Sequence, residues 1–341
     1  MTAQLVKKEE FSMKWNETEK KQLIIFALTA FGLPVLMGIL MGISYYRGND
    51  VTAFPTAQMF YPAAGVILAR LFTKREGEVL PKKFYFGFLA TTAVMIITAV
   101  ISMIWSQPDW TVLAQMPVIV FSIVLLILLC VEKKEVRRSY GLSFTGKPNA
   151  KSWLYMLLFF VLYMLRLLFS CALEGQTSVF VEIVTDPMTY FMLLSLVISF
   201  FLSFSAFLGE EYGWRYFFGP LLQKRFGLKG GVLILGVAWG LWHLPINIFY
   251  YSPDTWMISV LLQIITCVSF AIFFGYGYLK TENIWVPVVM HYINNNMIAV
   301  LTGSTDISGN VYRWQDVPLT LLVDAVFILF LFSKVYRRKE K

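Results

Sequence analysis

Long apolar runs recur along almost the whole chain and predict membrane-spanning helices. A helix needs about twenty residues to cross roughly 30 Å of hydrocarbon at 1.5 Å per residue. The runs here are apolar at odd and even positions alike, whereas strands of a membrane barrel alternate over about ten residues. We therefore expect an all-α, polytopic transmembrane helical bundle with about ten spans, near 23–45, 54–72, 84–105, 111–131, 153–173, 193–218, 231–250, 257–279, 284–302 and 317–335.

The composition supports a membrane protein and excludes an ordinary soluble domain. Hydrophobic residues make up 57% of the 341 residues and charged residues only 15%, whereas soluble domains are about one quarter charged. The net charge of +8 does not indicate nucleic-acid binding, because the basic residues lie in short connections beside the apolar runs. The partner that the sequence predicts is the lipid bilayer, with no nucleic acid.

The distribution of basic residues predicts the orientation of the bundle. If the N-terminus is cytoplasmic and ten spans alternate, 26 of the 29 Lys and Arg residues lie on the cytoplasmic side. Only Arg47 and Arg313 lie outside, and Arg166 lies inside the fifth span. Because basic loops stay in the cytoplasm, we expect both termini inside and a multi-pass location in the cell membrane. A missed span would invert every later loop and remove this asymmetry.

Ionisable residues inside the predicted spans are the candidates for chemistry. The end of the sixth span carries Glu210 and Glu211, and both histidines of the chain, His243 and His291, lie in later spans. Such groups are costly in a membrane and are functional candidates by default. Glu211 and Arg215 are four residues apart and can form a structural ion pair, while Glu210 points about 100° away and is free for another partner.

The depths of these groups are similar. Glu210 lies 14 residues before Lys224, His243 lies 14 after Lys229, and His291 lies 11 after Lys280. If these lysines mark the cytoplasmic surface, all three groups lie about 15–20 Å along their helices from it. We therefore expect them to meet in one layer, in an active site that opens toward the cytoplasm.

Two kinds of amide hydrolysis fit these residue types. Glu210 paired with His243 can activate water, while His291 and the amide of Asn295, four residues later on the same face, can donate to an oxyanion. Alternatively, Glu210, His243 and His291 can hold zinc with water in an open position. The residues leave both a zinc cofactor and a metal-free mechanism open. Arg166, Glu174 and Asp324 are interpreted as structural, with Asp324 paired to an arginine.

Three motifs resemble those of a known family. Glu210, Glu211 and Arg215 fit E-E-x-x-x-R, and His291 with Asn295 fits H-x-x-x-N. His243 follows Trp239 where the family pattern F-x-x-x-H usually has phenylalanine. Over roughly residues 195–300 the chain resembles the type II CAAX prenyl endopeptidase and bacteriocin-processing group of intramembrane proteases, also called CPBP or Abi.

The resemblance implies a membrane endopeptidase that cleaves near the cytoplasmic side. Its substrate would be a peptide or protein with a membrane-proximal or lipidated C-terminus. The family is catalogued as metallopeptidase, although its residues also suit a glutamate-dependent reaction without metal. The bacterial roles it implies are peptide or bacteriocin maturation, self-immunity and surface-protein processing.

The expected organisation has four parts. These are a cytoplasmic segment 1–22, helices of unassigned role 23–190, a protease core 191–305, and a last helix with a basic cytoplasmic tail 306–341. A non-catalytic scaffold or transporter-like partner with the same fold is the alternative, although the sequence shows no inverted repeat of the kind that transporters use. The sequence does not indicate an oligomeric state.

Overall fold

The structure, a computed structural model, describes residues 14–105, 107, 109–304 and 306–337. Throughout these residues the regular secondary structure is helical. In chain order the helices are α1 (Glu17–Ala27), η1 (Leu28–Gly32), α2 (Leu33–Tyr46), α3 (Ala53–Gln58), α4 (Tyr61–Phe72), α5 (Lys82–Ile104), α6 (Trp110–Leu113), α7 (Gln115–Val131), α8 (Lys134–Ser139), α9 (Ser152–Leu173), α10 (Thr177–Thr185), α11 (Pro187–Glu211), η2 (Tyr212–Phe218), α12 (Gly219–Trp242), α13 (Leu244–Ile246), η3 (Asn247–Tyr251), η4 (Pro253–Thr255), α14 (Trp256–Thr281), α15 (Trp285–Thr302), α16 (Asp316–Ile328) and η5 (Leu329–Phe332).

Six helical segments of the described residues are long and apolar enough to cross a membrane. They are Glu17–Tyr46, Lys82–Ile104, Trp110–Val131, Ser152–Leu173, Pro187–Tyr251 and Pro253–Thr281. The 65-residue segment Pro187–Tyr251 holds both the sixth and the seventh predicted span. These helices confirm the all-α, multi-pass class, whereas the number ten and the cytoplasmic position of both termini stay predictions.

Two predicted spans correspond to helices that are shorter than predicted. The second and tenth coincide with α4 and α16, of 12 and 13 residues, and α10, of nine residues, lies between the fifth and sixth spans without having been predicted. Of the predicted N-terminal segment 1–22, residues 1–13 lie outside the described residues. Helix α1 begins at Glu17, where the side chain of Asn16 accepts a hydrogen bond from the backbone of Glu19.

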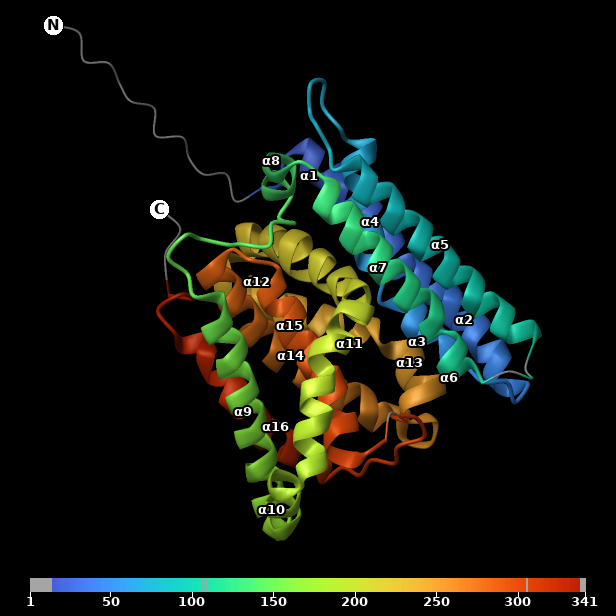
Figure 1. The fold of residues 1–341 in the computed structure, drawn as a ribbon, viewed down its shortest axis with the longest axis vertical. Coiled ribbons are helices and arrows are strands. Elements are labelled where there is room, and N and C mark those ends of the chain that lie inside the picture. Colours follow the sequence, from blue (N-terminus) through green and yellow to red (C-terminus); the bar gives the residue numbers. More distant parts are fainter. Residues whose placement is uncertain (1–13, 106, 108, 305, 338–341) are drawn as a thin grey trace, which may run out of the picture.

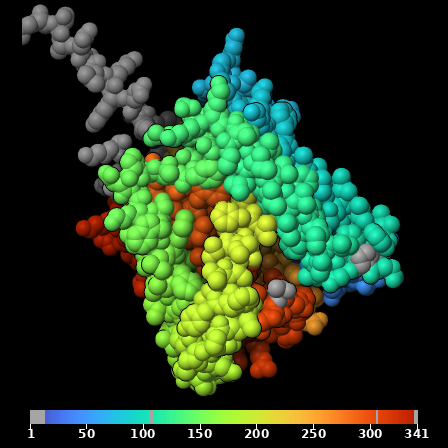
Figure 2. Space-filling model, viewed as in Figure 1, coloured from blue at the N-terminus to red at the C-terminus, as the bar shows by residue number. Residues whose placement is uncertain are grey.

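Helix α11 and its continuation η2 run between two groups of helices (Figure 1). On one side α11 packs against α4 and α7, and on the other it packs against α15. Helices α12, α14 and α16 pack in succession, and α9 covers α15 and α16. Figure 2 shows α11 in yellow-green, standing between the green surface of α9 and the teal surface of the N-terminal helices.

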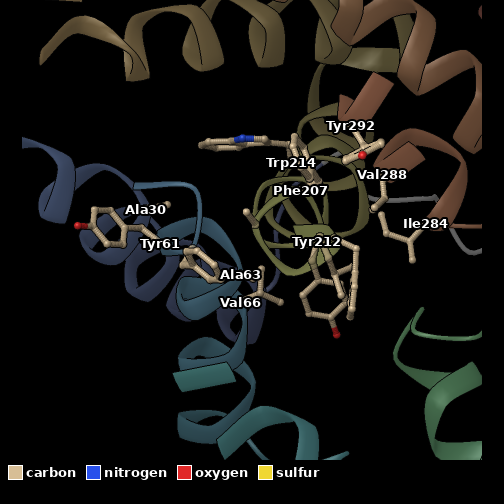
Figure 3. Packing of buried hydrophobic residues seen from close by; sticks show 14 of the residues in the cluster. Ala30, Tyr61, Ala63, Val66, Phe207, Tyr212, Trp214, Ile284, Val288 and Tyr292 are labelled. Carbon is tan, nitrogen blue, oxygen red and sulfur yellow. The ribbon is translucent and has the colours of Figure 1, made fainter. Parts of the chain in front are cut away.

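The buried packing around α11 joins both groups. Tyr61, Ala63 and Val66 of α4 lie on one side of Trp214 and Tyr212, while Val288 and other residues of α15 lie on the other (Figure 3). Trp214 and Tyr212 are almost fully buried. Because interiors are densely packed, both the N-terminal and the C-terminal helices help to fix the position of α11.

Helix α12 turns back on itself and then packs closely on α14. Gly227 has φ +73° and separates two helical arms, and the backbone of Gly231 on the second arm lies directly against Gln223 on the first. A Cβ atom on Gly236 would lie 2.5 Å from Cα of Val268, and one on Gly240 would lie 2.6 Å from Cα of Ile264. Small residues four apart allow this approach of two backbones, as in other membrane helix pairs.

A buried ion pair joins α9 to α16. The Arg166 Nε atom donates to Asp324 Oδ1 at 2.6 Å, and Asp324 is fully buried. Glu174 instead accepts from Ser170 Oγ at 3.4 Å. The predicted pairing of Asp324 with an arginine is therefore confirmed, and it joins two helices that are far apart in sequence.

Candidate active site

The two adjacent carboxylates lie where α11 passes into the π-helical turns of η2. Glu210 is 2% exposed and Glu211 is fully buried. Residues of this helix that follow Glu211, including Trp214 and Arg215, are buried as well. The carboxylates therefore have to be satisfied by protein groups, since leaving a buried charge unpaired costs several kcal/mol.

Glu210 is held by two indole groups. Its Oε2 atom accepts from Trp239 Nε1 at 2.7 Å and from Trp214 Nε1 at 3.3 Å. Trp214 is one helical turn along the same helix, and Trp239 comes from α12. Glu210 also lines a cavity of about 500 Å³. One oxygen is thus fixed by N–H donors while the residue faces an open space.

Glu211 joins an arginine and a histidine. Its Oε1 atom accepts from Arg215 Nη1 at 2.9 Å and from His291 Nδ1 at 2.8 Å. The guanidinium of Arg215 lies over the Trp239 ring, 4.1 Å from its centroid, and 5.0 Å from that of Phe274. The pair that the i,i+4 spacing suggested is present, and His291 completes a buried cluster of three.

His243 is the C-cap residue of α12, and a hydrogen bond fixes the orientation of its ring. Its Nδ1 atom lies 2.8 Å from the carbonyl oxygen of Trp239. A carbonyl oxygen only accepts, so Nδ1 carries the hydrogen, and Nε2 of the neutral ring is an acceptor. The carbonyl of His243 accepts from Asn247 Nδ2 at 2.9 Å, and Asn247 Oδ1 accepts from Ser259 Oγ at 2.5 Å. Asn247 and Ser259 therefore fix the backbone on which His243 sits.

Trp239 lies at the centre of the cluster. Its ring centroid is 5.4 Å from that of His291 and 6.1 Å from that of His243. The same side chain donates to Glu210 and lies under Arg215. Phenylalanine, the usual residue of the family pattern, would supply the ring without the N–H donor.

Asn295 lies apart from the buried cluster. It is exposed, its Oδ1 atom accepts from Asn294 Nδ2 at 2.9 Å, and it lines the same cavity as Glu210. The structure thus joins His291 to Glu211 by a hydrogen bond and places Asn295 and Glu210 on one cavity. The hydrogen bonds of Glu210 run to indoles and not to His243.

The donor set does not fit a metal centre as it is arranged. Among the residues that the structure describes, no group of three or more His, Cys, Asp or Glu side chains is placed to hold a metal ion. No step below is therefore assigned to zinc on Glu210, His243 and His291.

Several contacts of the site were missed from the sequence. The i,i+4 spacing that paired Glu211 with Arg215 applies equally to Glu210 and Trp214, and it could have predicted that indole contact. The bonds from Trp239 to Glu210 and from His291 to Glu211 join helices 29 and 80 residues apart. Contacts between residues so far apart in the sequence cannot be predicted from local spacing.

One family model matches the part of the chain that contains the site. The buried acidic, basic and imidazole groups between these helices form a polar site inside a multi-pass helical bundle. Residues 192–297 match the family model described as type II CAAX prenyl endopeptidase Rce1-like. The match supports the resemblance seen in the motifs and covers nearly the same residues. The family implies a membrane endopeptidase in general. No curated protein and no solved structure matches the chain.

The match contains every residue of the cluster. It begins in α11 and ends at Met297 in α15, so it spans Glu210, Trp239, His243, His291 and Asn295. The helices from α1 to α10 lie outside it.

Replacing Glu211 with glutamine should destabilise the fold more than the same change at Glu210. Glu211→Gln leaves the buried Arg215 guanidinium without its carboxylate, and breaking such a pair costs about 3–5 kcal/mol. Glu210→Gln keeps an oxygen that can accept from both indoles. Thermal unfolding of the two purified variants in detergent measures the difference. Equal melting temperatures would contradict this role of Glu211.

Trp239→Phe should lower peptide cleavage while preserving the fold. The ring under Arg215 stays, but the donor to Glu210 is lost, and a hydrogen bond to a charged group contributes about 1.5–3 kcal/mol. The cleavage rate should then fall about 10- to 100-fold. Trp214→Phe, which removes the longer bond at 3.3 Å, is the matched control and should show a smaller loss. An unchanged rate in Trp239→Phe, with normal melting, would exclude the positioning role.

Proposed function

We propose that this protein is an intramembrane endopeptidase that hydrolyses a peptide bond with water activated by Glu210. The observation that carries the proposal is the buried Glu210 carboxylate, which borders a cavity of about 500 Å³ while Trp239 and Trp214 hold one of its oxygens. A carboxylate fixed in this way is pre-organised as a general base. The Rce1-like match over residues 192–297 supports the same class of reaction.

The first step is attack by water on the scissile carbonyl carbon. Glu210 takes one proton of the water, and the acceptor Nε2 of His243 orients it. The new C–O bond gives a tetrahedral intermediate with negative charge on the former carbonyl oxygen. Because Oδ1 of Asn295 already accepts from Asn294, its amide N–H₂ is the end available to stabilise that oxygen.

The second step is breakage of the C–N bond. Glu210 returns its proton to the leaving nitrogen, which gives an amine and a carboxylic acid, and the acid then passes its proton to the amine. His291, held by Glu211 through Nδ1, is proposed to assist Asn295 in stabilising the oxyanion. Glu211 and Arg215 then act as positioning residues, since they touch His291 and Trp239 and not the reacting atoms.

The membrane arrangement belongs to the same proposal. Ten spans with both termini in the cytoplasm account for the basic connections, and the cell membrane is the location that follows. A polypeptide substrate follows from the family match. The motif resemblance adds two finer hypotheses. The substrate would carry a lipidated C-terminus, and the biological role would be bacteriocin maturation, self-immunity or surface-protein processing.

Glu210→Gln should abolish cleavage without unfolding the protein. Loss of a general base typically costs 10²–10⁴-fold in rate, so we expect a fall of at least about 100-fold. New N-termini in membrane proteins, mapped by mass spectrometry in cells that express the wild type or the variant, give the readout without a known substrate. Glu135→Gln, a change at an exposed carboxylate in α8, is the control. If both variants yield the wild-type set of termini, the scaffold alternative is favoured.

Removal of metal should leave the activity intact. The proposed steps use Glu210, His243 and Asn295, and no residue is required to bind zinc. The purified protein should therefore keep its cleavage rate after treatment with a strong chelator and dialysis, with metal content measured by mass spectrometry on the same sample. A rate that falls with the metal content and returns on addition of zinc would overturn the metal-free mechanism.

A further inference from the structure

The two ends of the bundle differ in charge. One end carries the basic connections, including α8 and the turn at Gly227, and the lysine Lys280 in the last turn of α14. The loops of the other end carry Arg47 and Arg313, together with the acidic residues Asp50, Asp109, Glu174, Glu182, Asp186, Asp254, Asp306 and Asp316. If basic loops remain in the cytoplasm, the first end is the cytoplasmic one.

Single helices connect these two ends and keep them far apart. Helix α5 runs 23 residues from Lys82 to Ile104, about 33 Å. Helix α14 runs 26 residues and reaches the basic end at Lys280, about 38 Å from its start. In Figure 1, α1 and α8 lie near one end of these helices, and α6 lies near the other. A residue at a helix end can therefore be assigned to one face.

The cavity at Glu210 is lined by residues from the end of the bundle that has few basic residues. Its lining includes Thr52 beside α3, Thr111 in α6, Tyr250 and Tyr251 in η3, and Ile307 after α15. The loops of this end are tied together, since the Gly309 and Asn310 amides donate to the carbonyls of Tyr250 and Tyr251 at 3.0 and 2.8 Å.

The side chains that follow Glu210 along the helix toward the basic end include closely packed ones. Trp214, Phe217 and Leu222 lie between Glu210 and the turn at Gly227, and each is at most 4% exposed. Depth along the helices was the reason to expect an opening to the cytoplasm. Depth measures distance from the basic surface alone, whereas the lining residues give the direction of the opening.

We infer that the cavity leads from Glu210 to the non-cytoplasmic face, so that the substrate is a polypeptide segment presented from that side. This inference rests on the proposed function for the identity of the bound molecule, and it replaces the expected cytoplasmic opening. Helices α3, α6 and α7, outside the family match, form one wall of the cavity. They are therefore part of the substrate site.

The lining also indicates the chemistry of that segment. Among the described residues that line the cavity, Glu210 is the one charged side chain, and the others are apolar or carry hydroxyls, phenols or amides such as Gln115 and Asn296. No lysine or arginine of this lining is available to pair with a terminal carboxylate. An uncharged segment of an exported or membrane-anchored polypeptide fits these walls.

Cysteine labelling in intact cells tests the direction of the opening. With Cys130, Cys171 and Cys267 replaced by alanine, Thr111→Cys at the cavity rim and Ser139→Cys in α8 give two exposed single thiols. We expect a charged, impermeant maleimide to label Thr111→Cys in intact cells and Ser139→Cys only after permeabilisation. The reverse pattern, or equal labelling of both, would overturn the inference.

A deeper thiol tests whether the cavity is continuous with that face. Met59 lines the cavity, and its carbonyl lies against Gly209, next to Glu210. Met59→Cys should react with a small charged methanethiosulfonate in intact cells. Reaction only after permeabilisation, or none while the variant melts normally, would show that the cavity does not open outward.

Vesicles of defined sidedness separate this inference from the proposed function. A pool of neutral, impermeant fluorogenic peptides should be cleaved by right-side-out vesicles at least tenfold faster than by inside-out vesicles, and not by the Glu210→Gln variant. Cleavage in inside-out vesicles alone would overturn the inference and leave the peptidase intact. Correct thiol labelling without cleavage in either vesicle would leave the opening in place and overturn the peptidase.

Discussion

The buried contact of Glu211 with Arg215 and His291 is the interaction on which the rest of the site depends. An ionised carboxylate between membrane helices must be paired, and here one oxygen accepts from groups on two different helices. That pairing fixes Arg215, which lies on the Trp239 ring, and Trp239 in turn holds Glu210. The position of the proposed base is therefore set through a chain of contacts that starts one residue away from it.

The fold class was predictable because it depends on properties that are local in sequence. Length and apolar content of the runs predicted helices at each span, and the helices α5, α9 and α14 coincide with predicted spans within a few residues. Glu210 and His291, polar residues within such runs, are buried in the structure. The spacing of Glu211 and Arg215 predicted their contact, since both lie on one helix.

The rest of the site could not be predicted because it depends on how helices pack. The hydrogen bond from Trp239 to Glu210 depends on how α12 packs beside α11, 29 residues away in sequence. The direction of the cavity likewise depends on α3 and α6, whose sequences carry no motif. Distance along a helix predicted depth, but it contains no information about which end of the bundle lines the cavity.

The turn at Gly227 has a consequence for biosynthesis. Glu210 and Trp239 lie on the two arms of one helical hairpin, 29 residues apart. A lone carboxylate entering the bilayer costs about 2.5–3.5 kcal/mol on insertion scales. A hairpin that leaves the insertion machinery as a unit brings the indole donor together with that carboxylate, before α14 and α15 have been synthesised. The contact that positions the proposed base would thus also offset the cost of placing it in the membrane.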